Sequence, residues 1–169
     1  MKLTRRTPLT LAVLAGLAWS AWHYLDLVHG DGLEPFTSDG CSAFPDGTIE
    51  FQDRWQRCCV AHDLAYWMGG TRAQREAADQ ALKQCVREVG EPQIAELMLQ
   101  GVRVGGSPYW PATYRWGYGW PWPRGYAPLN REEKARVREE LEEAAIDPAI
   151  PRPPALKGAA GTKTMTATP

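Results

Sequence analysis

Apolar side chains through the middle of the chain recur three and four positions apart, and no stretch alternates with the period of a strand. Residues at that spacing share one face of a helix, so the pattern predicts amphipathic helices. Start and stop signals give four predicted helices, at residues 50–67, 72–89, 92–104 and 131–146. We therefore expect a mainly α fold. The side of the first helix that is predicted to face inward carries Phe51, Trp55, Cys58, Cys59, His62 and Tyr66.

Glycines and capping residues mark the ends of these helices. Gly69 and Gly70 follow the first helix, where glycine is a common stop signal. Because only this short turn precedes the second helix, we expect the two helices to run antiparallel. The other boundary residues are Thr71 with Gln74 or Glu76 at the start of the second helix, Gly90 at its end, Pro92 at the first position of the third, and Asn130 with Glu133 in a capping box before the fourth.

The N-terminal segment, residues 1–25, has the pattern of an export signal. Lys2, Arg5 and Arg6 precede an uncharged apolar run of about 14 residues, whereas a membrane span needs about 20. Cleavage near residues 18–20 and retention as an uncleaved membrane anchor both fit this pattern. In either case we predict export, to the periplasm or as a secreted protein, and therefore an oxidising compartment.

Residues 26–147 form one predicted domain, followed by a tail rich in Pro, Ala and Thr at residues 148–169. The chain has 169 residues, of which 44% are hydrophobic and 23% charged, as in ordinary globular proteins. The tail has too few large apolar residues to form a core, so we expect it to be disordered. The formal net charge of −1 argues against a general nucleic-acid binder.

Four cysteines in an exported chain predict two disulfide bonds. A bridge between the adjacent Cys58 and Cys59 is badly strained, so the two remaining pairings both join these residues to Cys41 and Cys85. Each bridge would stabilise the fold by about 3 kcal/mol in the chain-entropy model. The alternatives are free buried thiols, or a zinc site made of Cys41, Cys58, Cys59 and His62.

Residues 58–66, with the sequence CCVAHDLAY, carry the densest chemistry of the chain. His62 and Asp63 project about 100° apart on a helix, so each can serve a different partner. Asp79, 17 residues after His62, can face the imidazole if the first two helices are antiparallel. A carboxylate bonded to one imidazole nitrogen leaves the other nitrogen basic, and in the absence of a serine nucleophile the natural nucleophile is water.

A hard cation would complete such a site. Asp63 points away from His62, and the loop at residues 39–41 lies nearby if Cys41 is bonded to one of the paired cysteines. Carboxylates and backbone carbonyls are ligands suited to Ca²⁺. A bound cation polarises a substrate carbonyl and stabilises an oxyanion, so base, water and cation together describe ester hydrolysis.

This stretch resembles the C-C-x-x-H-D-x-C-Y signature of the secreted phospholipase A2 superfamily, and the resemblance extends over residues 38–86. It implies that His62 is the general base and that Asp63 is a Ca²⁺ ligand. It also implies that Tyr66 supports their network and that Asp79 bonds to the histidine. The implied fold is a phospholipase A2-like core of two antiparallel disulfide-linked helices with a calcium loop, plus extra helices and an aromatic segment rich in Pro and Gly.

The resemblance further implies the disulfide pairing Cys58–Cys85 and Cys41–Cys59. Ala65 and Ala78 stand where the family has two cysteines that pair with each other. Both partners of that bridge are absent together, so no orphan thiol remains.

The predicted calcium loop differs from the Gly-rich loop of animal enzymes and is similar to the short bacterial-type loop. In that type an Asp side chain and the next carbonyl bind the metal, which corresponds to Asp39 and Gly40. Asp46 is a weaker ligand candidate.

Residues 107–128 are irregular and rich in tryptophan and tyrosine. From Leu97 to Asn130 there is no acidic residue, whereas Arg103, Arg115 and Arg124 are basic. Trp and Tyr favour the membrane interface and Arg binds phosphate well, so one hypothesis is a lipid-docking loop. The alternative is an aromatic layer, braced by proline, that packs over the helices. Three cations are too few to favour nucleic-acid stacking.

Taken together, the sequence predicts a calcium-dependent hydrolase of phospholipid acyl esters. We expect it to act as a monomer on a phospholipid membrane surface, with Ca²⁺ as its cofactor and no nucleic-acid partner. Two alternatives stay open: a non-catalytic lipid-binding module on the same scaffold, and a small disulfide-linked structural domain without a metal.

Overall fold

The computed structural model describes residues 16, 17, 19, 20, 32–144 and 146–153. The chain divides into two units, Met1–Gly32 and Leu33–Pro169, and every residue predicted for the site belongs to the second. The predicted export signal at residues 1–25 lies almost wholly outside the described residues, as do residues 154–169 of the predicted tail. Across the described part of the chain, no helix has the length and apolar character needed to cross a membrane.

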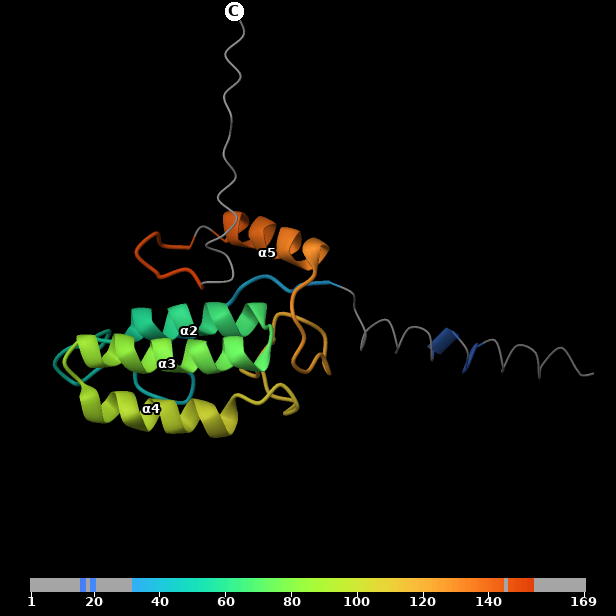
Figure 1. The fold of residues 1–169 in the computed structure, drawn as a ribbon. Helices are drawn as coiled ribbons and strands as arrows, with labels where there is room; N and C mark the ends of the chain where they lie inside the picture. The colour runs from blue at the N-terminus through green and yellow to red at the C-terminus, as the bar shows by residue number, and fades with distance from the viewer. Residues whose placement is uncertain (1–15, 18, 21–31, 145, 154–169) are drawn as a thin grey trace, which may run out of the picture. The chain divides into compact units, whose positions relative to one another are not determined.

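Four helices make up the regular structure of the second unit, and the described residues contain no strand, so the predicted mainly α class is confirmed. Helix α3 lies between α2 and α4, and α2 and α3 run antiparallel, as Figure 1 shows. The helices are α2 at Gln56–Met68, α3 at Arg72–Glu88, α4 at Pro92–Gly105 and α5 at Arg131–Glu143.

The predicted capping box before the fourth helix is present, and the predicted start signal of the second helix is also a capping box. The Thr71 side chain accepts a hydrogen bond from the Gln74 backbone N–H, and the Gln74 side chain accepts one from the Thr71 N–H. Asn130 and Glu133 make the same reciprocal pair before α5. These bonds satisfy N–H groups that a helix start leaves without partners, which is why the pattern identifies a helix start so well.

The first predicted helix begins later than expected, at Gln56 rather than at residue 50. Trp55 is held outside the helix because its indole N–H donates to the Pro45 carbonyl at 2.6 Å and its backbone N–H donates to the Asp46 carbonyl at 3.0 Å. Phe51 lies in the turn before the helix and is 49% exposed, so its predicted inward position is wrong. The other predicted inward residues of this helix are buried.

The two disulfides pair Cys41 with Cys59 and Cys58 with Cys85, which confirms the pairing expected from the resemblance. No cysteine is left free, so neither the free-thiol nor the zinc alternative holds. The Cys58–Cys85 bridge joins the first turn of α2 to the last turn of α3, as antiparallel helices require. The Cys41–Cys59 bridge ties the preceding loop to α2.

Part of the aromatic segment is a layer packed on the helices. Trp116 and Trp120 are buried, and their indole N–H groups donate to the carbonyls of Gly70 and Met68, each at 2.8 Å. These bonds satisfy carbonyls at the end of α2 and in the turn that comes after it. In contrast, four other aromatic residues of the segment are exposed, namely Tyr109, Trp110, Tyr114 and Trp122.

The three arginines that were expected to meet phosphate all have partners inside the protein. Arg115 is buried and donates to two backbone carbonyls, at Gly117 and Trp120. Arg124 pairs with Glu133 and lies over the Trp120 ring. Arg103 makes an ion pair within the candidate site. The arginine component of the lipid-docking hypothesis therefore has no support in the fold.

Candidate active site

His62 on α2 and Asp79 on α3 face each other in the interior. The distance from His62 Nε2 to Asp79 Oδ1 is 3.0 Å, and the exposed fractions of the two side chains are 6% and 0%. Because an ionised carboxylate only accepts hydrogen bonds, Nε2 carries the hydrogen and Nδ1 remains as the acceptor. The pair predicted from the antiparallel helices is therefore present, with one ring nitrogen free to take a proton.

Tyr66 is the third predicted member of this network, one turn after His62 on α2. Its hydroxyl donates to the same Asp79 oxygen at 2.8 Å and accepts a hydrogen bond from Arg75 Nε at 3.0 Å. Burial, followed by the charge of Asp79, raises the pKa of Tyr66 far above its usual value, so the hydroxyl remains a donor. Gly106 makes room for this ring, since a Cβ at that position would collide with the Tyr66 hydroxyl.

Two arginines that the sequence analysis did not identify as site residues surround the other oxygen of Asp79. Arg103 Nε, from α4, lies 2.9 Å from Oδ2, and Arg75 Nε lies 4.0 Å from it. Arg75 is itself buried and sits four residues before Asp79 on α3. That i,i+4 spacing could have pointed to Arg75, whereas Arg103 comes from a separate helix and gave no local signal.

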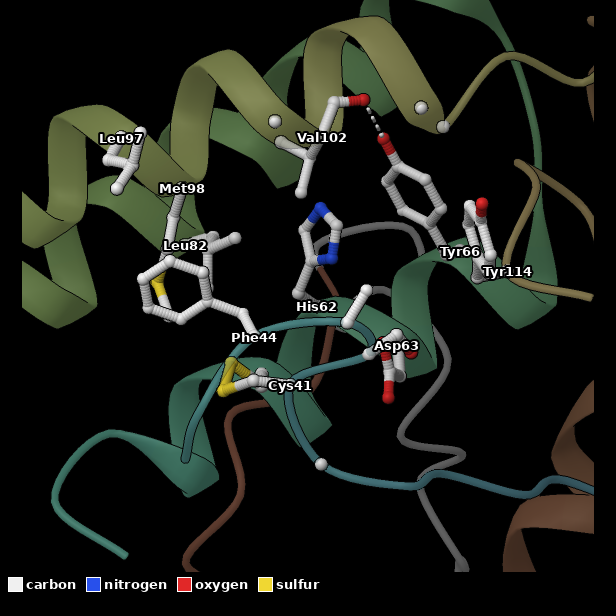
Figure 2. Close-up of a pocket in the computed structure, with 17 residues that line it drawn as sticks. Cys41, Phe44, His62, Asp63, Tyr66, Leu82, Leu97, Met98, Val102 and Tyr114 are labelled. Carbon is white, nitrogen blue, oxygen red and sulfur yellow. Dashed lines mark hydrogen bonds between the residues drawn. A yellow bond between two sulfur atoms is a disulfide. The ribbon is translucent and has the colours of Figure 1, made fainter. Parts of the chain in front are cut away.

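An apolar cavity of about 350 Å³ opens over His62. Figure 2 shows the imidazole directed toward Val102, whereas Asp63 projects from α2 in a different direction. Apolar side chains from the 41–44 loop, α3 and α4 dominate the walls, and the backbone of α4 approaches the cavity at two glycines. The wall residues of most consequence are Phe44, Leu82, Leu97, Met98, Gly101 and Gly105.

A second, polar cavity of about 260 Å³ lies beside the first, and both Asp39 and Asp63 line it. Asp63, Ser42 and Tyr114 line both cavities, so the polar and apolar spaces meet next to His62. Gly40 lines the apolar cavity instead. Two of the three predicted calcium ligands thus share one cavity, and the carbonyl of Gly40 stays a prediction.

Each of the two carboxylates in the polar cavity is held by a serine hydroxyl. Ser38 Oγ donates to Asp63 Oδ2, and Ser42 Oγ donates to Asp39 Oδ1, both at 2.6 Å. These bonds use one oxygen of each carboxylate, which leaves the other oxygen for a further ligand. Neither serine was identified from the sequence, because a serine in a loop carries no signal of its own.

Negative charge in this region is not balanced by a basic side chain of the cavity lining. The pKa of Asp63 is raised to about 7, chiefly by burial; a hydrogen bond from Ser38 lowers it, and the negative charges of Asp39 and Asp46 add to the rise. Burial and the charges of Asp63 and Asp39 also raise the pKa of Tyr118. A cation bound between the carboxylates would relieve this repulsion.

Asp46, the weaker ligand candidate, supports the loop instead of lining the polar cavity. One of its oxygens accepts the Cys41 N–H at 2.7 Å, and the other accepts from the Gln56 side chain at 3.1 Å. Gly40 packs directly against this carboxylate and has a positive φ of 82°. A side chain at position 40 would meet both a steric and a backbone penalty, so glycine is required there.

The donor set fits a hard cation better than a transition metal. Within the described residues, no group of three or more His, Cys, Asp or Glu side chains could hold a metal ion. A cation in the polar cavity would therefore depend on the carboxylates of Asp39 and Asp63, backbone oxygens and water. Those are oxygen ligands of the kind Ca²⁺ takes in proteins.

Comparison of the chain with known protein families, with curated proteins and with solved structures finds no match. The chemistry of the site therefore has to be inferred from its own residues. Of the six residues predicted for it, His62, Tyr66 and Asp79 form one bonded cluster, and Asp39 and Asp63 lie together in the adjoining cavity.

Proposed function

We propose that this protein is a calcium-dependent hydrolase of phospholipid acyl esters, similar in chemistry to phospholipase A2. The observation that carries the proposal is the buried His62–Asp79 pair at the floor of an apolar cavity, with Asp63 at its border. A base, an apolar binding space and a cluster of hard oxygen ligands meet at one place. A general base, a Lewis-acid cation and a space for a hydrocarbon chain are together what the assisted hydrolysis of a lipid ester requires.

In the proposed reaction, His62 Nδ1 takes a proton from a water molecule as that water attacks the ester carbonyl. Asp79 holds the imidazole in the required tautomer and balances the charge that develops on the ring. The same nitrogen then returns the proton to the leaving alcohol oxygen. Ca²⁺ held by Asp63, Asp39 and the Gly40 carbonyl would polarise the ester carbonyl and stabilise the oxyanion.

The apolar cavity supports a fatty-acyl chain as the part of the substrate that is bound. Phe44, Leu82 and Met98 present hydrocarbon and thioether surface that is favourable only to an apolar ligand. A water molecule beside the imidazole would lie where this apolar space meets the polar one. The ester carbon, placed between the chain and the headgroup, would then lie next to His62.

The exposed side chains around this cavity favour a membrane surface as the source of the substrate. Leu97 and Tyr114 line the cavity and are 54% and 48% exposed. Trp110, four residues before Tyr114 in the sequence, is also exposed. Trp and Tyr side chains are favourable at the lipid–water interface. We expect Trp110→Ala with Trp122→Ala to weaken binding to phosphatidylcholine vesicles severalfold, and the exposed Phe51→Ala to have no effect. Equal partitioning of all variants contradicts surface docking through this segment.

The experiment that tests hydrolysis measures fatty-acid release from phosphatidylcholine vesicles with Ca²⁺ or with EDTA. His62→Gln, which keeps a polar side chain of similar size, should lower the rate by about 10²–10⁴-fold. Gln93→Ala, at an exposed position of α4, serves as the control. Release that is unchanged by EDTA, or by the loss of His62, contradicts the proposal.

The same experiment separates the alternative of a non-catalytic lipid-binding module. That alternative predicts vesicle binding without release of fatty acid, in the wild type as well as in His62→Gln. A binding module has no need of an imidazole oriented by a buried carboxylate, so the His62–Asp79 pair favours turnover.

A further inference from the structure

Helix α4 contributes to the candidate site in two ways. Leu97, Met98 and Gly101 form part of the wall of the apolar cavity. Further along the same helix, Arg103 reaches across to Asp79 on α3. The helix that would hold the acyl chain therefore also contacts the carboxylate that orients the proposed base.

The two oxygens of Asp79 have different surroundings. Oδ1 takes two short hydrogen bonds, from His62 Nε2 and the Tyr66 hydroxyl. Oδ2 is buried without an aligned hydrogen bond, and its nearest partner is the ion pair with Arg103 Nε at 2.9 Å. The rotation of the carboxylate, and with it the direction of Oδ1, thus depends on Arg103. A buried carboxylate that loses such a partner is strongly destabilised, because its charge is left uncompensated.

Arg75 couples this arrangement to the backbone of α4. Its Nη2 donates to the carbonyls of Val102 and Arg103, at 2.8 and 3.1 Å, and its Nε donates to the Tyr66 hydroxyl. Its guanidinium is 4.0 Å from Oδ2, which is too far to replace a direct contact. Arg75 therefore fixes where α4 ends relative to the network, and Arg103 makes the contact with the carboxylate.

We infer that Arg103 is a positioning residue for the proposed hydrolysis, on which this inference rests: it holds Oδ2 so that Oδ1 faces His62. The guanidinium suits this task because its planar group carries five N–H donors that point in fixed directions, two of which are used here. While Nε faces Asp79, Nη2 donates to the Glu76 carbonyl of α3 at 3.3 Å. A lysine has one nitrogen and cannot fix both contacts, so it can replace Arg103 only in part.

The test compares Arg103→Met and Arg103→Lys with the exposed control Arg87→Met. Three quantities are measured: kcat and KM for fatty-acid release from phosphatidylcholine vesicles with Ca²⁺, the thermal midpoint, and the rate at which phenacyl bromide alkylates His62, followed by mass spectrometry. The alkylation rate reports the orientation of the imidazole without requiring turnover. All rates are referred to the folded fraction.

For Arg103→Met we expect kcat to fall about 10–100-fold with KM within about twofold of wild type, since partners of an orienting group have effects of this size. Alkylation of His62 should slow to a similar extent. Arg103→Lys should recover part of both rates, and Arg87→Met should match wild type. If Arg103→Met does not fold, Arg103→Lys decides the matter, because a lower kcat at unchanged KM supports the inference and a wild-type kcat overturns it.

The outcomes for the inference and for the proposed function can be told apart. If the wild type releases no fatty acid while Arg103→Met still slows alkylation of His62, the positioning role stands and the proposed function falls. If the wild type hydrolyses lipid and Arg103→Met retains both kcat and the alkylation rate, the positioning role falls. A change in KM alone, or a loss of rate that only tracks the loss of folded protein, also overturns it.

Discussion

The two halves of the candidate site, one around Asp79 and the other around Asp63, place carboxylates in opposite electrostatic settings. Asp79 is fully buried, but it has two hydrogen-bond donors on one oxygen and Arg103 on the other. Asp63 is half-buried beside two more carboxylates, and within the described residues its one hydrogen bond comes from the neutral hydroxyl of Ser38. One half is balanced by the protein itself, whereas the other half carries an excess of negative charge.

This difference assigns a separate task to each half. A carboxylate that is balanced in advance can hold an imidazole in one orientation without rearrangement, which is what a general base requires. A carboxylate cluster without a basic partner is destabilising on its own and becomes favourable when a cation binds. The contrast therefore predicts opposite consequences when one carboxylate is removed from each half.

The largest effect is expected for Asp79→Asn. Loss of the charge no longer fixes the imidazole tautomer, and it leaves Arg103 without the carboxylate of its ion pair. Hydrolysis should fall by about 10³–10⁴-fold, and the free energy of unfolding should fall by about 3–5 kcal/mol. Vesicle assays and urea denaturation measure the two quantities.

A matched control for this change is Asp53→Asn, at an exposed position before α2. The dissociation constant for Ca²⁺ of Asp79→Asn, measured by calorimetry on the folded protein, should stay within about twofold of wild type. The substitution leaves Asp39 and Asp63, the proposed Ca²⁺ ligands, unchanged. A variant that loses Ca²⁺ affinity as well would show that the two halves are not separate.

The next largest effect concerns the disulfides. The double variants Cys41→Ser/Cys59→Ser and Cys58→Ser/Cys85→Ser should each lower the free energy of unfolding by about 3 kcal/mol. Only the first should also weaken Ca²⁺ binding, because the Cys41–Cys59 bridge ties the Asp39 loop to α2. Calorimetry with each variant tests this, and equal loss of affinity in both would contradict it.

A smaller effect of opposite sign is expected for Asp63→Asn in EDTA. Because the pKa of Asp63 is raised from 3.8 to about 7, the folded protein binds this proton more tightly than the unfolded chain does. The resulting stability is fully present below about pH 4 and is lost as the pH rises to about 7. At pH 8 the variant should therefore be more stable than wild type by at least about 1 kcal/mol.

Denaturation in urea at pH 4 and pH 8 measures this difference. The stability gain of Asp63→Asn should appear only at the higher pH, and added Ca²⁺ should stabilise the wild type but not the variant. Asp53→Asn should show neither behaviour. If Asp63→Asn is less stable than wild type at pH 8 without Ca²⁺, then removing either carboxylate destabilises the protein, and the predicted difference between Asp63 and Asp79 is wrong.

The smallest effect is expected for Ser38→Ala. Its hydroxyl orients Asp63 through one short hydrogen bond, whose net value is about 1 kcal/mol. The dissociation constant for Ca²⁺ should rise about fivefold, while alkylation of His62 by phenacyl bromide should not change. Ser107→Ala serves as the control. A changed alkylation rate would show that the residues around Asp63 also orient His62.

Local patterns in the sequence predicted most of the fold. The capping pairs Thr71–Gln74 and Asn130–Glu133 identify helix starts because they act over three residues of chain. The start of α2 could not be found in this way. It depends on the bond from the Trp55 indole to the Pro45 carbonyl, which forms only once the loop has folded back.

The same distinction holds for the site. His62, Tyr66 and Asp79 were predictable because helical spacing and a short turn bring them together. Arg103 was not, since its contact with Asp79 depends on how α4 packs against α3. Composition could not show which aromatic residues of the 107–128 segment are buried and which are exposed. Burial of Trp116, for example, depends on the position of the Gly70 carbonyl, to which its indole donates.

Helix α4 both lines the apolar cavity and carries the arginine that contacts Asp79, and this has a consequence for how the sequence can diverge. Substitutions on this helix that reshape the cavity would also move the anchor of Asp79, so they would change selectivity and rate together. Phe44 and Leu82 line the same space from the 41–44 loop and from α3, outside α4. Drift toward longer, shorter or bulkier acyl groups is therefore expected to accumulate at those two positions, while α4 stays under purifying selection.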